Sequence, residues 1–356
     1  MTGTHRSSNY STPTQLDMQG LANLLFGHAA FQYLRAACEL DLFETVNRFG
    51  SSTNKEQLRV ALKLEDRAAD ILLLGVTSLG LLVKENSTYR TADVLRELMD
   101  TDDWQRFKDT VAFEQYIVYE GQLDFTESLQ QNTNIGLQRF PGEGRDLYHR
   151  LHQDAKLEEV FYRYMRSWSE LANKDLVQHL DLSSTRRLLD AGGGDAVNAL
   201  ALAQANPALK VTVLDISHSI PVTQSKIEQA GLGDRVDARA LDILHEHFPE
   251  GYDCILFAHQ LVIWTLEENT HMLSKAYEAL PEGGRVVIFN SMSNDEGDGP
   301  VVAALDSVYF ACLPAEGGMI YAWEQHEQCL AAAGFKNPQR ISVPGWTPHG
   351  IIIAHK

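Results

Sequence analysis

The chain is poor in cysteine, and the few cysteines it has follow no recognisable pattern. Its 356 residues contain 4 cysteines. No two of them have the spacing of a metal-binding pair, and four are too few for a disulfide framework in a chain of this length. Apolar neighbours surround most of them, which is typical of buried thiols in a reducing compartment. We therefore expect unpaired core cysteines and a cytoplasmic protein. They are Cys38, Cys254, Cys312 and Cys329.

Positive charge and long apolar runs are also scarce. Lysine and arginine total 30 against 48 aspartates and glutamates, which gives a net charge of -18. Because phosphate groups repel such a chain, we exclude nucleic acids and anionic membranes as partners. No apolar run reaches the roughly 18 residues that span a bilayer. No set of three residues has the spacing of metal ligands either, so we predict no metal site.

The chain does have length and apolar content. At about 150 residues per domain, its length predicts two domains, and 44% hydrophobic residues supply a sizeable core. Residues 1–17 are polar and lack the apolar stretch of a secretion signal. We predict that they form a flexible N-terminal arm.

Residues 18–100 have the pattern of a winged-helix domain. Apolar residues recur at helical spacing between Leu21 and Leu34. Thr53, three residues before Glu56, fits a capping box that opens a helix. A second helix is predicted over 66–79, and two short strands over 81–83 and 88–90 complete a hairpin.

Winged helices often bind DNA, but the charge of this one argues against it. Between residues 51 and 93, six basic side chains are matched by six acidic ones. A DNA-binding surface needs an excess of positive charge. We therefore interpret residues 18–100 as a dimerisation domain and predict a homodimer, with a DNA-binding regulator as the alternative.

Residues 101–165 are predicted to form a helical linker that contributes to a substrate pocket. A polar, turn-rich stretch over 126–145 separates two helical stretches that carry several aromatic side chains. Aromatic residues at helical spacing usually belong to a core, and some line pockets. The pattern alone does not separate these two roles.

From about residue 185 onward, strands alternate with helices. This alternation predicts a parallel, doubly wound α/β sheet, which we place in a second domain over 166–356. The predicted strands are 187–191, 211–215, 236–241, 254–258, 285–290 and 351–355.

A glycine-rich loop follows the first of these strands. The run LLDAGGGD at 188–195 ends in Gly192, Gly193 and Gly194, and glycine lets the backbone approach a ligand closely. Ligands of open α/β sheets bind at this carboxyl edge. Asp215 ends the second strand and can accept both hydroxyls of a ribose. Asp242 follows the third strand and can reach an adenine amino group, while Asp190 can meet an ammonium.

Two cofactors compete for this loop. The dinucleotide fingerprint needs a third glycine at position 197, where this chain has Val197. Asp195, near the start of the following helix, would repel a diphosphate. A nucleoside without phosphates, such as S-adenosylmethionine, suits the loop better. A nicotinamide-dependent oxidoreductase remains the alternative.

With these residues the chain resembles the class I S-adenosylmethionine-dependent methyltransferases. More narrowly, it resembles the caffeic-acid-type methyltransferases of small molecules and their bacterial relatives in antibiotic pathways. The resemblance extends over the winged helix, the glycine loop, the run YEALPEGG at 277–284 and the run AGF at 333–335. It implies a Rossmann-like methyltransferase domain behind a helical dimerisation domain, and it places Met165 and Trp168 on a helix that covers the cofactor. We assign Ile243 and Ala258 to the same cofactor site.

The chain departs from this family at the catalytic positions. O-methylating members have a histidine two residues before the tryptophan that is here Trp264, and two acidic residues flank that histidine. These positions fall on Val262, Asn290 and Ile320. His259 lies close by, just beyond the fourth strand, and is our first candidate for the general base. Asn290 is a candidate hydrogen-bond partner for a phenol, and His152 is the next candidate base.

Two further runs are similar to a narrower branch, which methylates ring carbons of aromatic amino acids. They are NTNIGL at 132–137 and FPGEG at 140–144, taken together with LVIWT at 261–265. The resemblance implies an acceptor such as tyrosine, methylated at C3, or 3-hydroxykynurenine. An amino-acid acceptor needs a partner for its ammonium, for which Asp306 is our candidate. The other candidate acceptor-binding residues are Tyr116, His149, Trp264 and Tyr309.

A base near the phenol oxygen serves methylation of either oxygen or carbon. A phenol has a pKa of about 10 and is almost wholly protonated at neutral pH. Removing its proton enriches both the oxygen and the ortho carbon in electrons. The atom placed opposite the methyl donor decides the product. We favour carbon, with O-methylation of a phenolic metabolite as the main alternative.

Overall fold

The structure is a computed structural model, and it describes residues 16–50, 53–151, 153–343, 345 and 347–356, without the side chain of His149. The chain divides into two compact units, one ending at Gln115 and one running from Tyr116 to Lys356. The boundary falls within the stretch for which we predicted a linker. The predicted arm, except its last two residues, lies outside the described residues.

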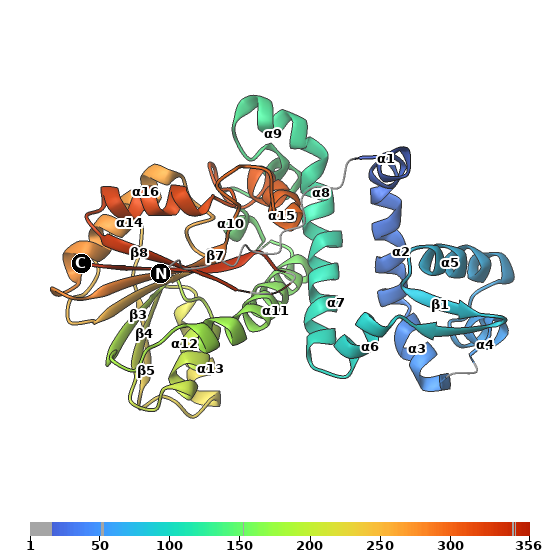
Figure 1. Cartoon of the computed structure of the whole chain (residues 1–356), viewed down its shortest axis with the longest axis horizontal. Coiled ribbons are helices and arrows are strands. Elements are labelled where there is room, and N and C mark those ends of the chain that lie inside the picture. The colour runs from blue at the N-terminus through green and yellow to red at the C-terminus, as the bar shows by residue number, and fades with distance from the viewer. Residues whose placement is uncertain (1–15, 51–52, 152, 344, 346) are drawn as a thin grey trace, which may run out of the picture. The chain divides into compact units, whose positions relative to one another are not determined.

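The first unit has the helix, turn, helix and hairpin order of a winged helix (Figure 1). Its hairpin pairs Leu82 with Thr91 and Glu85 with Thr88, so the predicted hairpin is confirmed. Its core lies between the helices and the hairpin and includes Phe43 and Val76. The elements are α1 (Met18–Leu25), α2 (Gly27–Glu39), α3 (Leu42–Phe49), α4 (Lys55–Ala61), α5 (Asp66–Ser78), β1 (Leu82–Glu85), β2 (Thr88–Thr91), α6 (Asp93–Met99) and α7 (Asp103–Phe113).

The capping box that opens α4 lies one residue later than the sequence predicted. Asn54 is the N-cap, and its side chain accepts a hydrogen bond from the backbone N–H of Gln57 while the Gln57 side chain accepts from that of Asn54. Thr53 is buried, and its hydroxyl donates to the carbonyls of Val46 and Gly50. The prediction of Thr53 with Glu56 was wrong because asparagine caps as well as threonine does, and burial of Thr53 decided between them.

Short helical segments, the first of which begins two residues before the second unit, lead into a long helix. That helix, α11, starts after Asp154, whose carboxylate accepts from the N–H groups of Lys156 and Leu157. The segments are η2 (Glu114–Val118), α8 (Tyr119–Gly121), η3 (Gln122–Asp124), α9 (Phe125–Gln131), η4 (Ile135–Arg139), α10 (Leu147–Leu151) and α11 (Ala155–His179).

A seven-stranded sheet in the order β5-β4-β3-β6-β7-β9-β8 forms the centre of the second unit. The first five strands in this order are parallel, as predicted, whereas β9 runs antiparallel to β7 and β8 antiparallel to β9. The strands are β3 (Arg187–Ala191), β4 (Lys210–Asp215), β5 (Val236–Ala240), β6 (Cys254–Ala258), β7 (Arg285–Ser291), β8 (Lys336–Ser342) and β9 (His349–His355).

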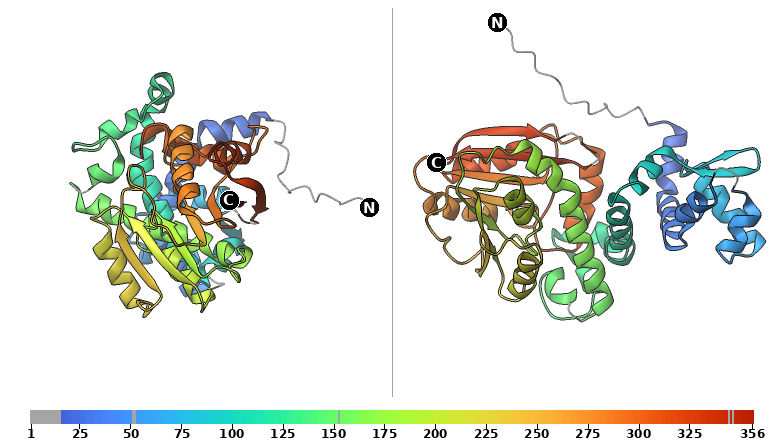
Figure 2. Two further views of the ribbon diagram at one scale, coloured as in Figure 1. Left: turned by 90° about the vertical axis from the view of Figure 1, so that its left-hand side faces the viewer. Right: turned by 90° about the horizontal axis from the view of Figure 1, so that it is seen from below.

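Helices cover both faces of this sheet (Figures 1 and 2). On one face, α11, α12 (Val197–Ala205) and α13 (Ile220–Gln229) pack on a core that includes Leu188 and Phe289. On the other, α14 (Leu266–Ala279) and α16 (Trp323–Ala332) pack on a core that includes Phe257 and Ile288. The remaining helix, α15 (Val301–Cys312), packs on α9. The fold is therefore the predicted doubly wound α/β arrangement, with an antiparallel pair at one edge.

All four cysteines are free and buried, as predicted. No helix in the described ranges is long and apolar enough to cross a membrane.

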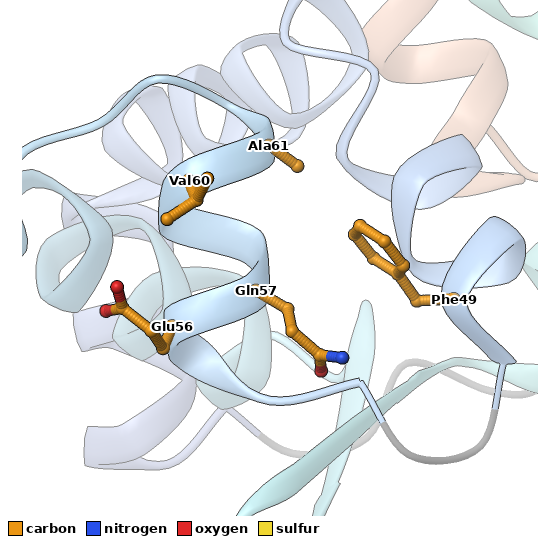
Figure 3. A pocket seen from close by; sticks show the side chains of 5 residues that line it. All are labelled: Phe49, Glu56, Gln57, Val60 and Ala61. Carbon is orange, nitrogen blue, oxygen red and sulfur yellow. The ribbon is translucent and has the colours of Figure 1, made fainter.

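A hollow between α3 and α4 in the first unit is lined by Phe49, Glu56, Gln57, Val60 and Ala61 (Figure 3). It contains none of the predicted site residues.

Candidate active site

The glycine loop between β3 and α12 is folded back on the neighbouring strand β4. The N–H groups of Gly192 and Gly193 both donate to the carbonyl of Leu214, at 2.8 and 3.2 Å. The N–H of Gly194 donates to Oδ2 of Asp215 at 2.8 Å. Gly192 and Gly194 have φ angles of 75° and 55°, a region that favours glycine. Gly194 and Asp215, predicted to act together, are therefore in direct contact.

The loop is tightly packed around Gly192 and Gly193 and open beside Gly194. A Cβ atom on Gly192 would lie 2.4 Å from Gln260, and one on Gly193 would lie 2.5 Å from a carboxylate oxygen of Asp190. A Cβ on Gly194 would meet nothing within 4 Å. Gln260 also donates from its amide to the carbonyl of Gly192 at 2.8 Å. Gly194 thus borders open space in which a ligand can approach the backbone.

Asp190 is fully buried beneath this loop. Neither carboxylate oxygen has a hydrogen-bond partner. Burial, with a smaller repulsion from Asp215, raises the pKa of Asp190 to about 7. An enclosed carboxyl without a partner is unfavourable on its own. Its predicted contact with an ammonium group stays a prediction, because the loop covers the carboxyl in this structure.

Two further carboxylates stand near the same edge. Burial raises the pKa of Asp215, while hydrogen bonds from the backbone of Gly194 and Ile216 oppose the rise. Burial also raises the pKa of Asp195, opposed by Arg166 and Lys226. Asp195 lies in the turn rather than in the helix, because α12 begins at Val197. Its negative charge still stands beside the loop and disfavours a diphosphate.

The loop after β5 presents Asp242. Oδ1 of Asp242 accepts from the N–H of Leu244 at 2.9 Å, and Oδ2 lies 2.8 Å from Nδ1 of His245. Burial raises the pKa of Asp242, but these hydrogen bonds outweigh burial and the net shift is downward. Lys275 holds the loop from below, because its Nζ donates to the carbonyls of Ile243, Leu244 and Glu246 at 2.6 to 3.0 Å. Ile243 is buried in this loop.

Met165 and Trp168 lie on α11 and are both half-buried. The Trp168 ring is 5.9 Å from that of Tyr164 and 5.5 Å from that of His349, measured between ring centroids. Ala258, at the end of β6, is buried beside β7. Trp168 of α11 therefore reaches the carboxyl edge of the sheet, and the contact of Met165 and Trp168 with the cofactor stays a prediction.

His259 follows β6 in a left-handed conformation with φ of 58°. Its backbone N–H donates to the carbonyl of Phe289 at 2.8 Å, and its ring lies 5.2 Å from the Phe289 ring. Nε2 is enclosed without a hydrogen-bond partner. Burial lowers the pKa of His259 to about 4. The imidazole is therefore neutral at pH 7, which is the form that accepts a proton, but it is a weaker base than an exposed histidine.

His349 belongs to the same cluster and was missed by the sequence analysis. It opens β9, is buried, and stands 5.0 Å from the His259 ring and 5.2 Å from the Phe289 ring. Burial, with a smaller contribution from His259, holds its pKa well below the usual value. No motif marks this histidine, because only the antiparallel pairing of β9 with β7 brings it to the carboxyl edge.

Asn290 in β7 is fully buried, and both amide atoms lack hydrogen-bond partners. No hydrogen bond joins it to His259, and the alternation of β7 directs it away from the face on which Phe289 lies. Val262 and Ile320 are buried as apolar residues, so these positions supply no acid or base. Trp264 is half-buried, with its indole N–H enclosed and unpartnered.

The predicted acceptor-binding residues occupy several elements. Asp306 and Tyr309 lie on α15, Tyr309 buried and Asp306 half-buried. Burial raises the pKa of Asp306 to about 7. Tyr116 lies in η2, with Nζ of Lys156 4.2 Å from its ring centroid. The side chain of His149 and all of His152 lie outside the described residues.

The residues at this edge fit S-adenosylmethionine. Gly194 leaves open space above a polar backbone, and the buried carboxyl of Asp190 lacks a partner. Two more carboxylates, Asp215 and Asp242, stand at the ends of successive strands. Within the described ranges, no group of three histidine, cysteine or acidic side chains is placed to hold a metal ion.

Comparison with known proteins identifies the family. The model of the O-methyltransferase domain family matches residues 125–336. An L-tyrosine C(3)-methyltransferase of Streptomyces lavendulae is 64% identical over 344 residues, which cover 96% of this chain and 93% of that relative. The chain belongs to the O-methyltransferase family. It is an S-adenosylmethionine-dependent methyltransferase, as the glycine loop and the acids after it predicted.

Solved structures of methyltransferases have the same fold. The S-adenosylmethionine-dependent methyltransferase SibL, in its apo form, superposes with a TM-score of 0.88 at 45% identity, covering 96% of this chain and 99% of its own. Human N-acetylserotonin methyltransferase, in complex with S-adenosylmethionine, superposes with a TM-score of 0.81 at 19% identity, covering 97% and 99%. The predicted fold class and cofactor are confirmed.

Proposed function

We propose that this methyltransferase transfers a methyl group to a phenolic amino acid, at the ring carbon next to the hydroxyl, as in tyrosine C3. The observation that carries the proposal is the 64% identity, over nearly the whole chain, to an L-tyrosine C(3)-methyltransferase. The resemblance supports it as well, because it places Val262, a buried apolar residue, where O-methylating members have their catalytic histidine. Antibiotic or other secondary-metabolite biosynthesis is the setting that this acceptor implies.

In the proposed reaction, the cofactor is held by the glycine loop and the acids of the neighbouring strands. Gly192 and Gly194 admit it to the backbone, Asp215 and Asp242 accept from its nucleoside hydroxyl and amino groups, and Asp190 accepts from its ammonium. Met165, Trp168, Ile243 and Ala258 border the same site. Bound S-adenosylmethionine supplies a methyl carbon whose bond to sulfur breaks as its bond to the acceptor carbon forms.

His259 is the proposed proton acceptor for the phenol. With its pKa at about 4, it does not ionise a phenol of pKa about 10 in advance, because that gap corresponds to about 8 kcal/mol. The phenol proton therefore moves to His259 as the ring carbon gains its new bond, when the hydroxyl becomes strongly acidic. The proton on that ring carbon then leaves to water, and its bonding electrons restore the aromatic ring while the oxygen takes a proton back from His259. His152 is the alternative base. The predicted contact of Asn290 with this phenol is not carried into the proposal, because Asn290 lies on the opposite face of β7 from Phe289, against which His259 packs.

The proposed function is tested by incubating the full-length enzyme with labelled S-adenosylmethionine and a panel of acceptors. We expect tyrosine or 3-hydroxykynurenine to be methylated, with label retained on the ring in the mass spectrum. Phenylalanine is the matched control, because it has the amino acid group but lacks the hydroxyl. Methylation of amine-free phenols alone would contradict the amino-acid part of the proposal.

Asp306 is the proposed partner of the substrate ammonium. It is a half-buried carboxyl on α15, one turn before the buried Tyr309, and no ion pair in the described part of the chain reaches it. A carboxyl whose pKa is raised by burial alone gains most from a cation that arrives with the ligand. Tyr116, His149, Trp264 and Tyr309 complete the proposed acceptor site.

We expect Asp306→Asn to lower kcat/KM for tyrosine by about 10- to 100-fold, because a charged hydrogen bond is worth about 1.5–3 kcal/mol. The reaction with 3-(4-hydroxyphenyl)propanoate, which has no amine, should change little. Since protonated Asp306 cannot pair with an ammonium, kcat/KM for tyrosine should also fall as the pH drops through about 7. Steady-state kinetics at saturating cofactor measure both effects. Equal losses of kcat/KM for the two acceptors would show that Asp306 does not bind the substrate ammonium.

We further propose a homodimer formed through the first unit. The helix α1 buries none of its residues, and the large apolar side chains at its end, Leu24, Leu25 and Phe26, are 69%, 67% and 60% exposed. Exposed apolar side chains gathered in this way mark interaction surfaces. Leu24→Glu combined with Leu25→Glu should convert the dimer to a monomer in sedimentation velocity. A wild-type monomer at micromolar concentration would contradict the proposal.

A further inference from the structure

His349 stands in the candidate site with no role in the reaction proposed above. It is 2% exposed, and both of its ring nitrogens are enclosed without hydrogen-bond partners. Leaving a buried polar group unsatisfied costs about 1–3 kcal/mol. Such a cost, placed at the carboxyl edge of the sheet beside a candidate base, calls for a functional explanation.

The neighbour of His349 is His259, and the two imidazole rings are perpendicular with centroids 5.0 Å apart. Nε2 of His259 is also enclosed without a partner, although the residue as a whole is half-buried. Nδ1 is therefore the nitrogen left for a ligand. With the ring centroids 5.0 Å apart, a hydrogen bond between Nε2–H of His259 and a nitrogen of His349 is within reach, either after rotation of a ring or through one bridging water.

The backbone around His259 is held on both sides. Its N–H is bound to the carbonyl of Phe289, and the next residue, Gln260, donates from its amide to Gly192. Its positive φ, uncommon for a residue with a side chain, is fixed by these contacts. These backbone contacts do not determine which ring nitrogen of His259 carries the proton. A neutral imidazole carries that proton on only one nitrogen, and its hydrogen-bond partner selects which.

We propose that His349 is a positioning residue that sets the tautomer of His259, by accepting a hydrogen bond from Nε2–H directly or through one water. Nδ1 of His259 then keeps its electron pair for the phenol proton. With the proton on Nδ1 instead, His259 would present a donor to the acceptor and could not act as the base. The inference rests on the proposed role of His259 in proton acceptance, and it follows the general rule that a catalytic base is oriented by a third group.

The tautomer is measured directly by long-range ¹H–¹⁵N spectra of full-length enzyme labelled with ¹⁵N-histidine. Four proteins are compared: wild type, His349→Phe, His349→Gln and the control His326→Phe. His326 in α16 is a matched control, because it is also buried with two unpartnered ring nitrogens. We expect the ring proton of His259 on Nε2 in the wild type and in His326→Phe. We expect the same in His349→Gln, because the glutamine amide oxygen still accepts a hydrogen bond. We expect a tautomer mixture in His349→Phe.

Kinetics provide the second readout. His349→Phe should lower kcat by about 10- to 100-fold, as loss of an outer partner of a catalytic group does, while KM and the Kd for S-adenosylhomocysteine stay within about twofold. His349→Gln should recover most of kcat, and His326→Phe should match the wild type. If His349→Phe keeps both the wild-type tautomer and the wild-type kcat, the inference is overturned. If the wild type does not methylate tyrosine, the proposed function fails, and the tautomer measurement still decides the role of His349.

Discussion

Gly194→Leu is expected to weaken cofactor binding strongly while leaving the fold intact. A Cβ atom at this position meets nothing within 4 Å, so a side chain has room there, at the backbone cost of a positive φ. The same open space is where we place the cofactor beside the N–H of Gly194. A leucine side chain fills that space and blocks the approach of the ligand to the backbone. We expect the Kd for S-adenosylhomocysteine to rise by at least about 100-fold, roughly 3 kcal/mol.

The matched control is Gly283→Leu, in the turn between α14 and β7. Gly283 also has a positive φ, 78° against 55°, and a Cβ there also meets nothing within 4 Å. Both variants therefore incur a similar backbone cost of about 1–2 kcal/mol. Titration calorimetry with S-adenosylhomocysteine and thermal melting separate the two effects. Equal affinities in the two variants would show that Gly194 does not border the cofactor.

His259→Phe should have the largest effect on catalysis. Phenylalanine keeps a ring against Phe289 and His349 but removes the proton acceptor. General-base catalysis contributes about 10²- to 10⁴-fold, so we expect kcat for tyrosine to fall by that factor while cofactor affinity changes little. Because burial lowers the pKa of His259 to about 4, the base form is present throughout the neutral range and is lost only as the pH falls toward about 4.

Two measurements check this prediction. Single-turnover kinetics report the chemical step, and calorimetry with S-adenosylhomocysteine reports the cofactor site. His259→Asn is a useful second variant, because asparagine tolerates the left-handed backbone and so preserves the local fold. Wild-type turnover in both variants would move the base to His152 or elsewhere.

The cofactor half of the site could be predicted from the sequence because its residues are adjacent to strand ends. In a parallel sheet, the residue after each strand reaches the same edge, so Gly194 and Asp215 must meet once β3 and β4 are recognised. The burial of Asp190 and the hydrogen bond from Gln260 to Gly192 could not be predicted, because both depend on how segments distant in the chain pack. Neither depends on a sequence pattern.

The catalytic half could be predicted only in part. His259 was identified from its place after β6, but its low pKa comes from surrounding residues that are distant in the chain. His349 was missed because the strand it opens is antiparallel, and nothing in the sequence fixes that direction. The edge strand β8 was missed because it is largely exposed and contains Pro338, which weakens any strand signal. The first residue of a helix also could not be predicted with certainty. The choice between Thr53 and Asn54 as the N-cap of α4 depended on the burial of Thr53, which the sequence does not show.

The most direct test of the account is the position of the transferred methyl group. The enzyme is incubated with L-tyrosine and S-adenosylmethionine labelled with ¹³C at the methyl carbon, and the product is examined by NMR. We expect the labelled methyl on the ring carbon next to the hydroxyl-bearing carbon, with one ring proton lost. A labelled methyl on the phenol oxygen, with every ring proton retained, would contradict the account.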